Sequence, residues 1–395
     1  MIDYKDGGIV CSKNLPKRPS RTFFYGLFTS CNLFERHILT DQPGIHTFAE
    51  ITSQSTIWNE AVAAFTGKSE ALAALWNKGG FDRVLFTGCG STHYLAQSGA
   101  ALFQQLTGTA ARAYPASEIA LLPDYVFLPT SSPLLIAVSR SGETTETVEA
   151  VRIFRARTGN PVVAVTCASS STLSRLADLN FSIDEAQETS VAQTRSFSSM
   201  LIVVQCIAAL VAGRSDLNVL NRLTATVTRL LERYSALAKQ LGEDRQIERF
   251  FFLGSGALYG VACEGMLKMK EMSLSYSEAY HVLEFRHGPM SMVNDHTLVV
   301  GLISEEVAPQ ELAVLRQMQA RGAQILILAE TDTQPGVTDW AHFVQLDTRL
   351  PIWARAVTYL PVLQLMAYFR ALSNSQNPDH PANLSFVIAL DKSMT

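Results

Sequence analysis

The chain has 395 residues, of which 47% are apolar and 17% charged, and its formal net charge is −4. This length favours two domains, and the low charged fraction favours a homo-oligomer, because average soluble domains carry roughly 25% charged residues. The acidic balance and the lack of clustered Lys and Arg exclude electrostatic binding to nucleic acid, whose phosphates require such clusters.

The first 43 residues differ from the rest of the chain. Five basic residues and the turn-forming KNLPKRPSR precede an aromatic FFYGLF without regular periodicity, so residues 1–43 are predicted to be an N-terminal extension. Residues 44–79 are predicted to be helical, because Thr47 and Glu50 form an S/T-x-x-E capping box before a helix that carries Trp58. No export signal is evident in either segment.

An internal duplication follows. RVLFTGCGSTHYLA (83–96) aligns without gaps with RFFFLGSGALYGVA (249–262). Two further apolar runs, PLLIAVS (133–139) and PVVAVT (161–166), correspond to TLVVGLIS (297–304) and AQILILA (323–329) at nearly the same offset. Short, fully apolar strands that alternate with helical segments indicate doubly wound parallel α/β domains. The sequence therefore predicts two such domains, at residues 80–215 and 245–372.

Three further segments complete this outline. MLIVVQCIAALVA (200–212) is shorter than the roughly 18 residues that cross a bilayer, so it is predicted to be a buried helix and no membrane partner is expected. Residues 216–244 are predicted to join the domains by a helix, because apolar residues recur there at helical spacing. Residues 373–395 are predicted to be a C-terminal tail with a Pro/Asn turn and one apolar strand.

The stretch SRSGETTETV (139–148) places five hydroxyl side chains around Gly142, where a strand gives way to a helix. Ligands of open α/β sheets bind beyond the carboxyl ends of the strands, and the free N–H groups of a helix N-terminus hold an anion without lysine. Together with TGCGST (87–92), this stretch predicts a phosphate monoester site. Such clusters also serve only as helix caps. The second copy, however, reads SEEVAPQ (304–310) and puts Glu305 and Glu306 where an anion would lie, so only the first copy is predicted to bind phosphate.

No cofactor or metal is expected from the sequence. TGCGST lacks the third glycine of a dinucleotide fingerprint because His93 occupies its place, and in the other copy Gly260 comes one residue late. The histidines lack zinc-type spacing. The six cysteines are scattered, which is typical of reduced thiols in a cytoplasmic protein.

The second copy carries candidates for acid/base chemistry. Its helix VACEGMLKMKEMS (261–273) places Glu264, Lys268 and Glu271 at i, i+4 and i+7 on one face. Such a row of charged side chains is often no more than a solvent-exposed helix face. Here its neighbours are apolar, and a half-buried carboxylate beside a lysine can act as a general base near neutral pH. Sixteen residues later His287, in EFRHGPM, lies in a loop with Glu284 nearby, where it is either structural or an acid/base group. A phosphate site with these groups suits proton transfer between adjacent carbons of a sugar phosphate.

Six motifs stand out in this sequence: CGST, SRSGETTETV, SVAQTRSF (190–197), CEGMLKMKEMS, EAYHVLEFRHGP (278–289) and NPDHPANLSFVI. Together they resemble the sugar isomerase (SIS) family, in the double-domain arrangement of the isomerase half of glucosamine-6-phosphate synthase and of stand-alone tagatose-6-phosphate and galactosamine-6-phosphate isomerase/deaminase relatives. The resemblance covers nearly everything after residue 45. It implies two tandem flavodoxin-like domains and a homodimer with a shared active site.

The resemblance also implies roles for residues that match the family motifs. Glu271 would move a proton between C1 and C2, and His287, from the other subunit, would help to open the sugar ring. Lys268 and Glu264 would support that carboxylate and the sugar hydroxyls. The sugar phosphate would be bound by Gly90, Ser91, Thr92, Ser139, Arg140, Ser141, Gly142 and Thr144, with Val191 and Gln193 lining the sugar site.

The sequence departs from the family pattern in three places. A glutaminase domain does not fit into about 45 residues, so ammonia derived from glutamine is not expected. The tail position of a lysine able to form a Schiff base is Phe386 here, and Lys392 lies in a different register. Arg140 replaces a commonly neutral residue in the phosphate loop and is expected to add charge to the phosphate site.

The leading functional hypothesis is a cytoplasmic, dimeric isomerase of a hexose or amino-hexose 6-phosphate, with or without loss of ammonia. Two alternatives remain open at this point. A non-catalytic sugar-phosphate sensor would bind the ligand unchanged, and a fructosamine-6-phosphate deglycase would release an amine with the same base and phosphate site.

Overall fold

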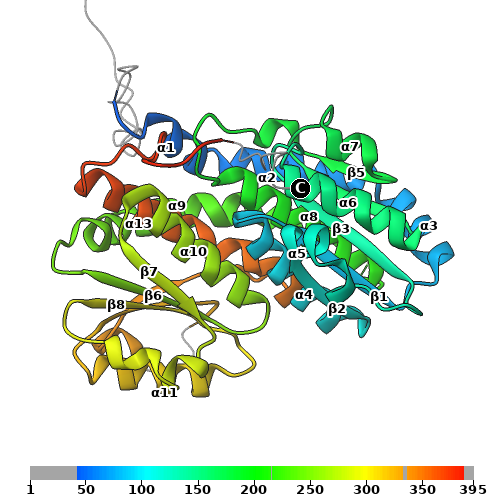
Figure 1. Ribbon diagram of the computed structural model, residues 1–395. Helices are drawn as coiled ribbons and strands as arrows, with labels where there is room; N and C mark the ends of the chain where they lie inside the picture. Colours follow the sequence, from blue (N-terminus) through cyan, green and yellow to red (C-terminus); the bar gives the residue numbers. More distant parts are fainter. Residues whose placement is uncertain (1–41, 215, 332–335, 387–395) are drawn as a thin grey trace, which may run out of the picture. The chain divides into compact units, whose positions relative to one another are not determined.

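The computed structural model describes residues 42–214, 216–331 and 336–386 (Figure 1), so the predicted extension lies almost wholly outside the described residues. The predicted helical segment consists of three helices, α1 (Ile45–Thr52), α2 (Gln54–Thr66) and α3 (Ser69–Gly79). α2 and α3 pack against the helix at residues 195–211, which covers the first of two parallel sheets, whereas α1 packs against the helix at residues 360–373.

The start of α1 contradicts the predicted capping box. α1 begins after Gly44, so Thr47 lies inside the first turn. The backbone N–H and the hydroxyl of Thr47 both donate to the Asp379 carboxylate, each at 2.7 Å. Trp58 belongs to the next helix, α2. The prediction was wrong because the cap is a carboxylate 332 residues away, which a local sequence pattern cannot reveal.

The first sheet has the strand order β2-β1-β3-β4-β5, and the strand pairs are parallel. This order is the flavodoxin-like 2-1-3-4-5 arrangement, in which the order of strands across the sheet reverses between the first and third strands. Its elements are β1 (Arg83–Gly88), α4 (Ser91–Thr107), β2 (Ala110–Pro115), α5 (Ala116–Leu121), β3 (Pro133–Ser139), α6 (Thr145–Thr158), β4 (Val162–Thr166), α7 (Thr172–Leu176), β5 (Leu179–Ser182) and α8 (Arg195–Val211).

The second sheet repeats this topology, with the order β10-β9-β8-β6-β7. Counted from β6 as the first strand, the order is again 2-1-3-4-5, so the predicted tandem duplication is confirmed. Its elements are β6 (Arg249–Gly254), α10 (Ala257–Ser273), β7 (Tyr276–Tyr280), β8 (Thr297–Leu302), α11 (Ala308–Gln319), β9 (Gln324–Ala329), β10 (His342–Gln345), α12 (Ile352–Arg355) and α13 (Leu360–Ser373).

Both faces of the central strands are buried, which explains why they are apolar throughout. In β3, Leu134 and Ile136 belong to a core that also includes residues of the second sheet, whereas Leu135 and Ala137 belong to a separate cluster on the opposite face. Alternating side chains on a strand point to opposite faces, so covering both faces requires apolar residues at every position. Helices accordingly cover both sides of the sheet (Figure 1).

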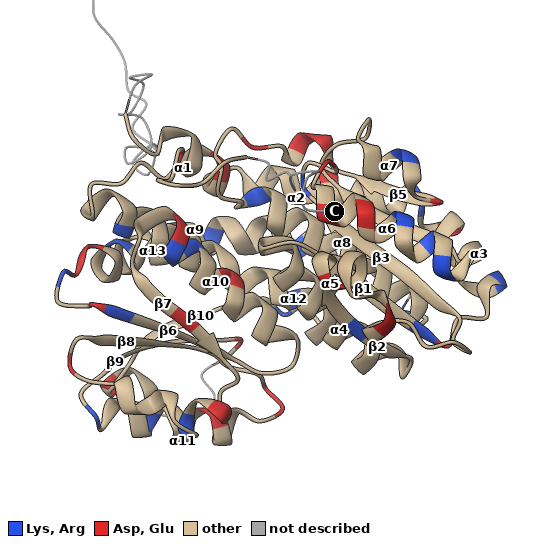
Figure 2. Ribbon diagram, in the orientation of Figure 1, with Lys and Arg blue, Asp and Glu red and all other residues tan. Residues whose placement is uncertain are grey.

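Helices join the two halves into one core. The predicted linker helix is α9 (Arg222–Glu243), which packs against α13 and α2. The predicted buried apolar helix is α8, and α4 packs against both α8 and α10. α4 carries no Lys, Arg, Asp or Glu, and α8 carries none after its first residue, Arg195 (Figure 2). Among the described residues, no helix is both long and apolar enough to cross a membrane.

Residues 374–386 of the tail contain no strand, and most of the apolar run predicted as one falls in 387–395, outside the described residues.

Candidate active site

The predicted phosphate loop lies at the reversal point of the first sheet. Ser139 ends β3, its hydroxyl accepts from the Gly142 N–H at 3.1 Å, and it lies 3.2 Å from the Thr144 hydroxyl. Thr144 immediately precedes α6, and no side chain of the described chain caps this helix. The first N–H groups of α6 are therefore free for an anion. The Ser141 hydroxyl accepts from the Glu143 N–H, which fixes the turn itself.

The neighbouring turn after β1 uses its two hydroxyls differently. Gly90 has φ 56, a conformation that favours glycine, and directly precedes α4. The Thr92 hydroxyl accepts from the N–H of Cys89 and donates to its carbonyl, so it closes the turn. The Ser91 hydroxyl instead donates to Glu264 of α10, at 3.3 Å. Ser91 thus links the phosphate side of the first half to the second half.

The predicted row of charged side chains on α10 is an ion-pair cluster. The Lys268 ammonium lies 3.3 Å from a Glu264 oxygen and 2.7 Å from a Glu271 oxygen. It also donates to the Ser91 hydroxyl at 3.4 Å. The side chains of Glu264 and Lys268 are 0% and 1% exposed, whereas that of Glu271 is 21% exposed. Glu271 is therefore the member of the cluster that a ligand can reach.

Burial sets the protonation behaviour of this cluster. Desolvation raises the pKa of Glu264 to about 7, against the opposing effect of Lys268. For Lys268, desolvation lowers the pKa, but the two neighbouring carboxylates outweigh it and the net shift is upward. Lys268 therefore stays charged and holds the Glu271 carboxylate by a charge-assisted hydrogen bond. The second oxygen of Glu264 is buried without a partner among the described residues.

Close packing of α4 against α10 brings the two halves of the site together. A Cβ at Gly260 would lie 2.3 Å from the Tyr94 carbonyl oxygen and 2.5 Å from the Ser98 hydroxyl, so only glycine permits this approach. Ser98 in turn donates to the Ala257 carbonyl at 2.6 Å. Gly260, which comes one residue late for a dinucleotide motif, thus permits the close packing of α4 against α10. Burial and the charges of Cys263, Glu264 and Glu271 raise the pKa of Tyr94.

The predicted sugar-lining residues lie on the loop before α8. Val191 is half-buried. Its N–H donates to the Asp379 carbonyl, and its carbonyl accepts from the Arg140 guanidinium. The side-chain oxygen of Gln193 is buried and has no partner among the described residues. Buried acceptors without a partner are rare in folded proteins, so Gln193 is suited to bind a ligand hydroxyl. The Glu188 carboxylate fixes this loop by accepting from the N–H and the hydroxyl of Thr194.

Two predicted site residues form no hydrogen bond or ion pair with the cluster on α10 among the described residues. His287 lies between two short 3-10 helices, is exposed, and no hydrogen bond joins it to Glu271 within the described chain. The Arg140 guanidinium is buried and points to the loop before α8, where its partners are the Val191 carbonyl and Glu188. Sequence reasoning missed this contact and the carboxylates Glu50, Glu188 and Asp379, because they pair with Thr189, Arg140 and Thr47, which are distant in the chain.

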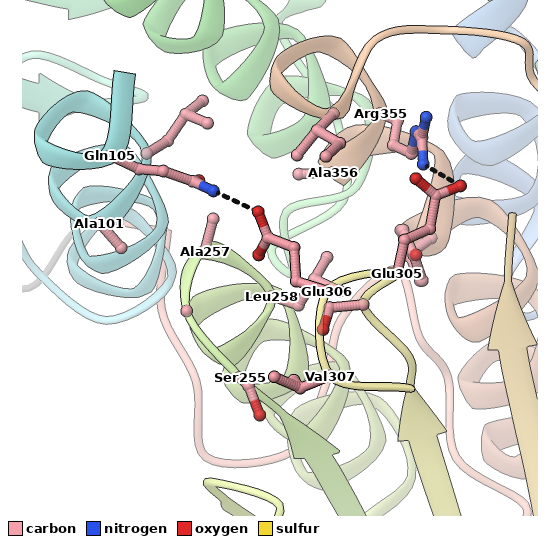
Figure 3. Close-up of a pocket in the computed structure, with 15 residues that line it drawn as sticks. Ala101, Gln105, Ser255, Ala257, Leu258, Glu305, Glu306, Val307, Arg355 and Ala356 are labelled. Carbon is pink, nitrogen blue, oxygen red and sulfur yellow. Dashed lines mark hydrogen bonds and ion pairs between the residues drawn. The ribbon is translucent and has the colours of Figure 1, made fainter. Parts of the chain in front are cut away.

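The equivalent place in the second half is a cavity of about 400 Å³ (Figure 3). It lies at the ends of β6 and β8 and is lined by Ser255 and by the two acids of SEEVAPQ. Glu305 pairs with Arg355 at 2.9 Å, and Glu306 accepts from Gln105 at 2.8 Å. Two carboxylates and one guanidinium leave this rim negative, which disfavours phosphate. That only the first copy binds phosphate stays a prediction, which this negative rim favours.

Comparison with known proteins gives the family. The SIS domain matches residues 81–210 and 245–372. Glutamine--fructose-6-phosphate aminotransferase [isomerizing] of Pyrococcus horikoshii is 28% identical over 350 residues, covering 87% of this chain and 57% of that protein. The chain thus spans a little over half the length of this relative.

Solved structures show the same fold. Glucosamine-6-phosphate deaminase from Thermotoga maritima matches with a TM-score of 0.70 and 28% identity, covering 87% of this chain and all of that chain. Tagatose-6-phosphate ketose/aldose isomerase from Escherichia coli matches with a TM-score of 0.75 and 22% identity, over 87% of this chain and 98% of that chain. With two matched domains over most of its described length, this chain belongs to the SIS domain family.

Proposed function

We propose that the chain is a sugar-phosphate isomerase that converts a hexose 6-phosphate or amino-hexose 6-phosphate between aldose and ketose forms by proton transfer between C1 and C2. With a 2-amino sugar, the same transfer followed by addition of water gives the ketose phosphate and ammonia. The printed names of the relatives, an isomerising aminotransferase, a deaminase and a ketose/aldose isomerase, support this class of substrate.

The observation that carries the proposal is the cluster of Ser91, Lys268 and Glu271. Ser91 follows β1, the neighbour of β3 in the first sheet, so it lies at the same sheet edge as the Ser139–Thr144 turn. It is bonded to the group that holds the Glu271 carboxylate. One sugar phosphate can therefore have its phosphate at the N-terminus of α6 and the C–H group that loses a proton beside Glu271.

The geometry supports a role for each of these groups. Glu271 removes the proton from one carbon and returns it to its neighbour, because its carboxylate is both accessible and held by Lys268. Lys268 keeps that carboxylate oriented. Gln193 supplies a buried acceptor for a sugar hydroxyl, and Glu264 pairs with Lys268 from the buried side. His287 of the partner subunit assists ring opening, a role that the single chain leaves to a second copy.

The test is a panel of ketose, aldose and amino-sugar 6-phosphates incubated with the purified protein in deuterated water. We expect exchange of the C2 proton with at least one member, and release of ammonia if that member is an amino sugar. Glu271→Gln is expected to reduce the rate at least about 100-fold, the usual contribution of a general base, while substrate still binds.

Three outcomes separate the alternatives. Binding without exchange, unaffected by Glu271→Gln, would identify a sensor. Release of free amino acid from a fructosamine 6-phosphate would identify a deglycase. Absence of binding by any sugar 6-phosphate would refute the proposed substrate class.

A further inference from the structure

The backbone of Arg140 is part of the predicted phosphate loop, whereas its side chain extends to a different region. It lies between Ser139 and Ser141, and its carbonyl accepts from the Cys167 N–H and the Thr166 hydroxyl. Its guanidinium, 6% exposed, extends to the loop before α8. There it donates to the carbonyls of Val191 at 2.9 Å and Ser190 at 3.3 Å.

The same guanidinium also reaches the C-terminal tail. One of its nitrogens donates to the Phe386 carbonyl at 3.4 Å, and the carbon of the guanidinium lies 4.0 Å from the centre of the Phe386 ring. This is the geometry of a cation–π contact, which is worth more when the cation is shielded from water. A single side chain thus contacts the phosphate loop, the sugar-lining loop and the tail.

The tail is fixed to the sugar-lining loop at a second point. The Asp379 carbonyl accepts from the Val191 N–H at 3.0 Å. Val191 is therefore held on one side by the tail and on the other by Arg140. The charge of Arg140 is also matched, because Glu188 lies 3.6 Å from it and is fully buried. A guanidinium already shared between three carbonyls, a carboxylate and a ring has little capacity left for a phosphate.

We propose that Arg140 is a positioning residue that acts through Val191 and Phe386, joining the sugar-lining loop to the tail at the sugar end of the site, and is not a phosphate ligand. The proposal rests on the proposed function for its substrate, but its structural content concerns contacts within the chain. It revises the expectation that Arg140 adds charge to the phosphate site.

The variants that test it separate charge from shape. Arg140→Lys keeps the charge but loses the planar fork and most of the stacking, whereas Arg140→Gln loses the charge. Phe386→Leu keeps an apolar side chain and loses the ring. Arg152→Gln, on the exposed face of α6, serves as the control because its ion pair with Glu149 is solvent-exposed.

Three measurements are made on each variant. They are the binding of inorganic phosphate by calorimetry, KM and kcat for the active sugar 6-phosphate, and hydrogen–deuterium exchange of peptides covering residues 188–194 and 379–386. We expect unchanged phosphate binding, a KM raised about tenfold with a smaller change in kcat, and faster exchange in both peptides for all three variants of Arg140 and Phe386. The double variant Arg140→Lys with Phe386→Leu is expected to be no worse than either single change.

Two results would overturn the proposal. Loss of phosphate binding in Arg140→Gln with normal behaviour of Arg140→Lys would make Arg140 a phosphate ligand. Independent, additive effects of Arg140→Lys and Phe386→Leu, or unchanged exchange in both peptides, would show that the two residues do not act together. The hydrogen–deuterium exchange measurement needs no substrate. Failure of the proposed function is therefore recognised separately: no sugar phosphate is turned over, while the variants still speed exchange in both peptides.

Discussion

At the scale of single residues, Glu264 is the most perturbed acid of the site. It is fully buried, its pKa is raised to about 7, and one of its oxygens has no partner among the described residues. A carboxylic acid with such a pKa changes charge near neutral pH, when Lys268 is still protonated. The net charge beside Glu271 therefore depends on pH in the physiological range.

This shift predicts a pH-dependent stability. The folded state binds the Glu264 proton more tightly than the unfolded state does, so this contribution is complete below pH 4.5 and is lost as the pH rises to about 7. The change from 4.5 to about 7 corresponds to roughly 3 kcal/mol. We expect the free energy of unfolding of the wild type to fall relative to that of Glu264→Gln across this range, as measured by urea denaturation at several pH values. A constant difference between the two proteins would contradict the burial effect.

At the scale of elements, the turn between β3 and α6 requires glycine at one position. Gly142 has φ 64, and a Cβ there would lie 2.0 Å from the Ser171 hydroxyl oxygen. Gly159, at the other end of α6, has φ 66 but open space around it. The two glycines therefore share a backbone conformation and differ in their surroundings.

This pair predicts different outcomes for the same substitution. Gly159→Ala should cost only the left-handed conformation, about 1 kcal/mol. Gly142→Ala should cost at least about 2 kcal/mol and abolish binding of inorganic phosphate, because the turn must move away from Ser171. Urea unfolding and calorimetry on both variants provide the measurement. Intact phosphate binding in Gly142→Ala would show that the turn does not form the anion site.

The elements also show which local predictions succeed. The sequence run PLLIAVS is β3 residue for residue, because a strand buried on both faces must be apolar throughout. The face shared by Glu264, Lys268 and Glu271 follows from helical spacing alone. The capping box failed because Thr47 bonds to Asp379, a partner that only the folded chain supplies.

At the scale of the whole molecule, the proposed function combines residues from two copies of the chain. His287 is exposed and has no hydrogen bond to Glu271 among the described residues, although both belong to motifs that suit acid/base chemistry. A shared site predicts that two inactive variants restore each other. Random pairing of Glu271→Gln with His287→Ala gives about half mixed dimers, each with one intact site, so about a quarter of the wild-type activity is expected.

The measurement is the activity recovered after the two variants are mixed, unfolded and refolded together, with each variant refolded alone as the control. Recovery near zero, together with mixed dimers seen by native mass spectrometry, would place His287 and Glu271 in the same chain or outside one site.

The sequence by itself determined the duplication, the parallel sheets, the hydroxyl loop of the first half and the acid/base helix of the second, because each is a local pattern of burial, turn or spacing. Only the tertiary structure decided that Ser91 meets Glu264, that Gly260 serves helix packing, and that Arg140 turns from the phosphate loop to Val191 and the tail. These contacts join residues far apart in the chain, and such pairings depend on how the helices pack, which no local pattern records.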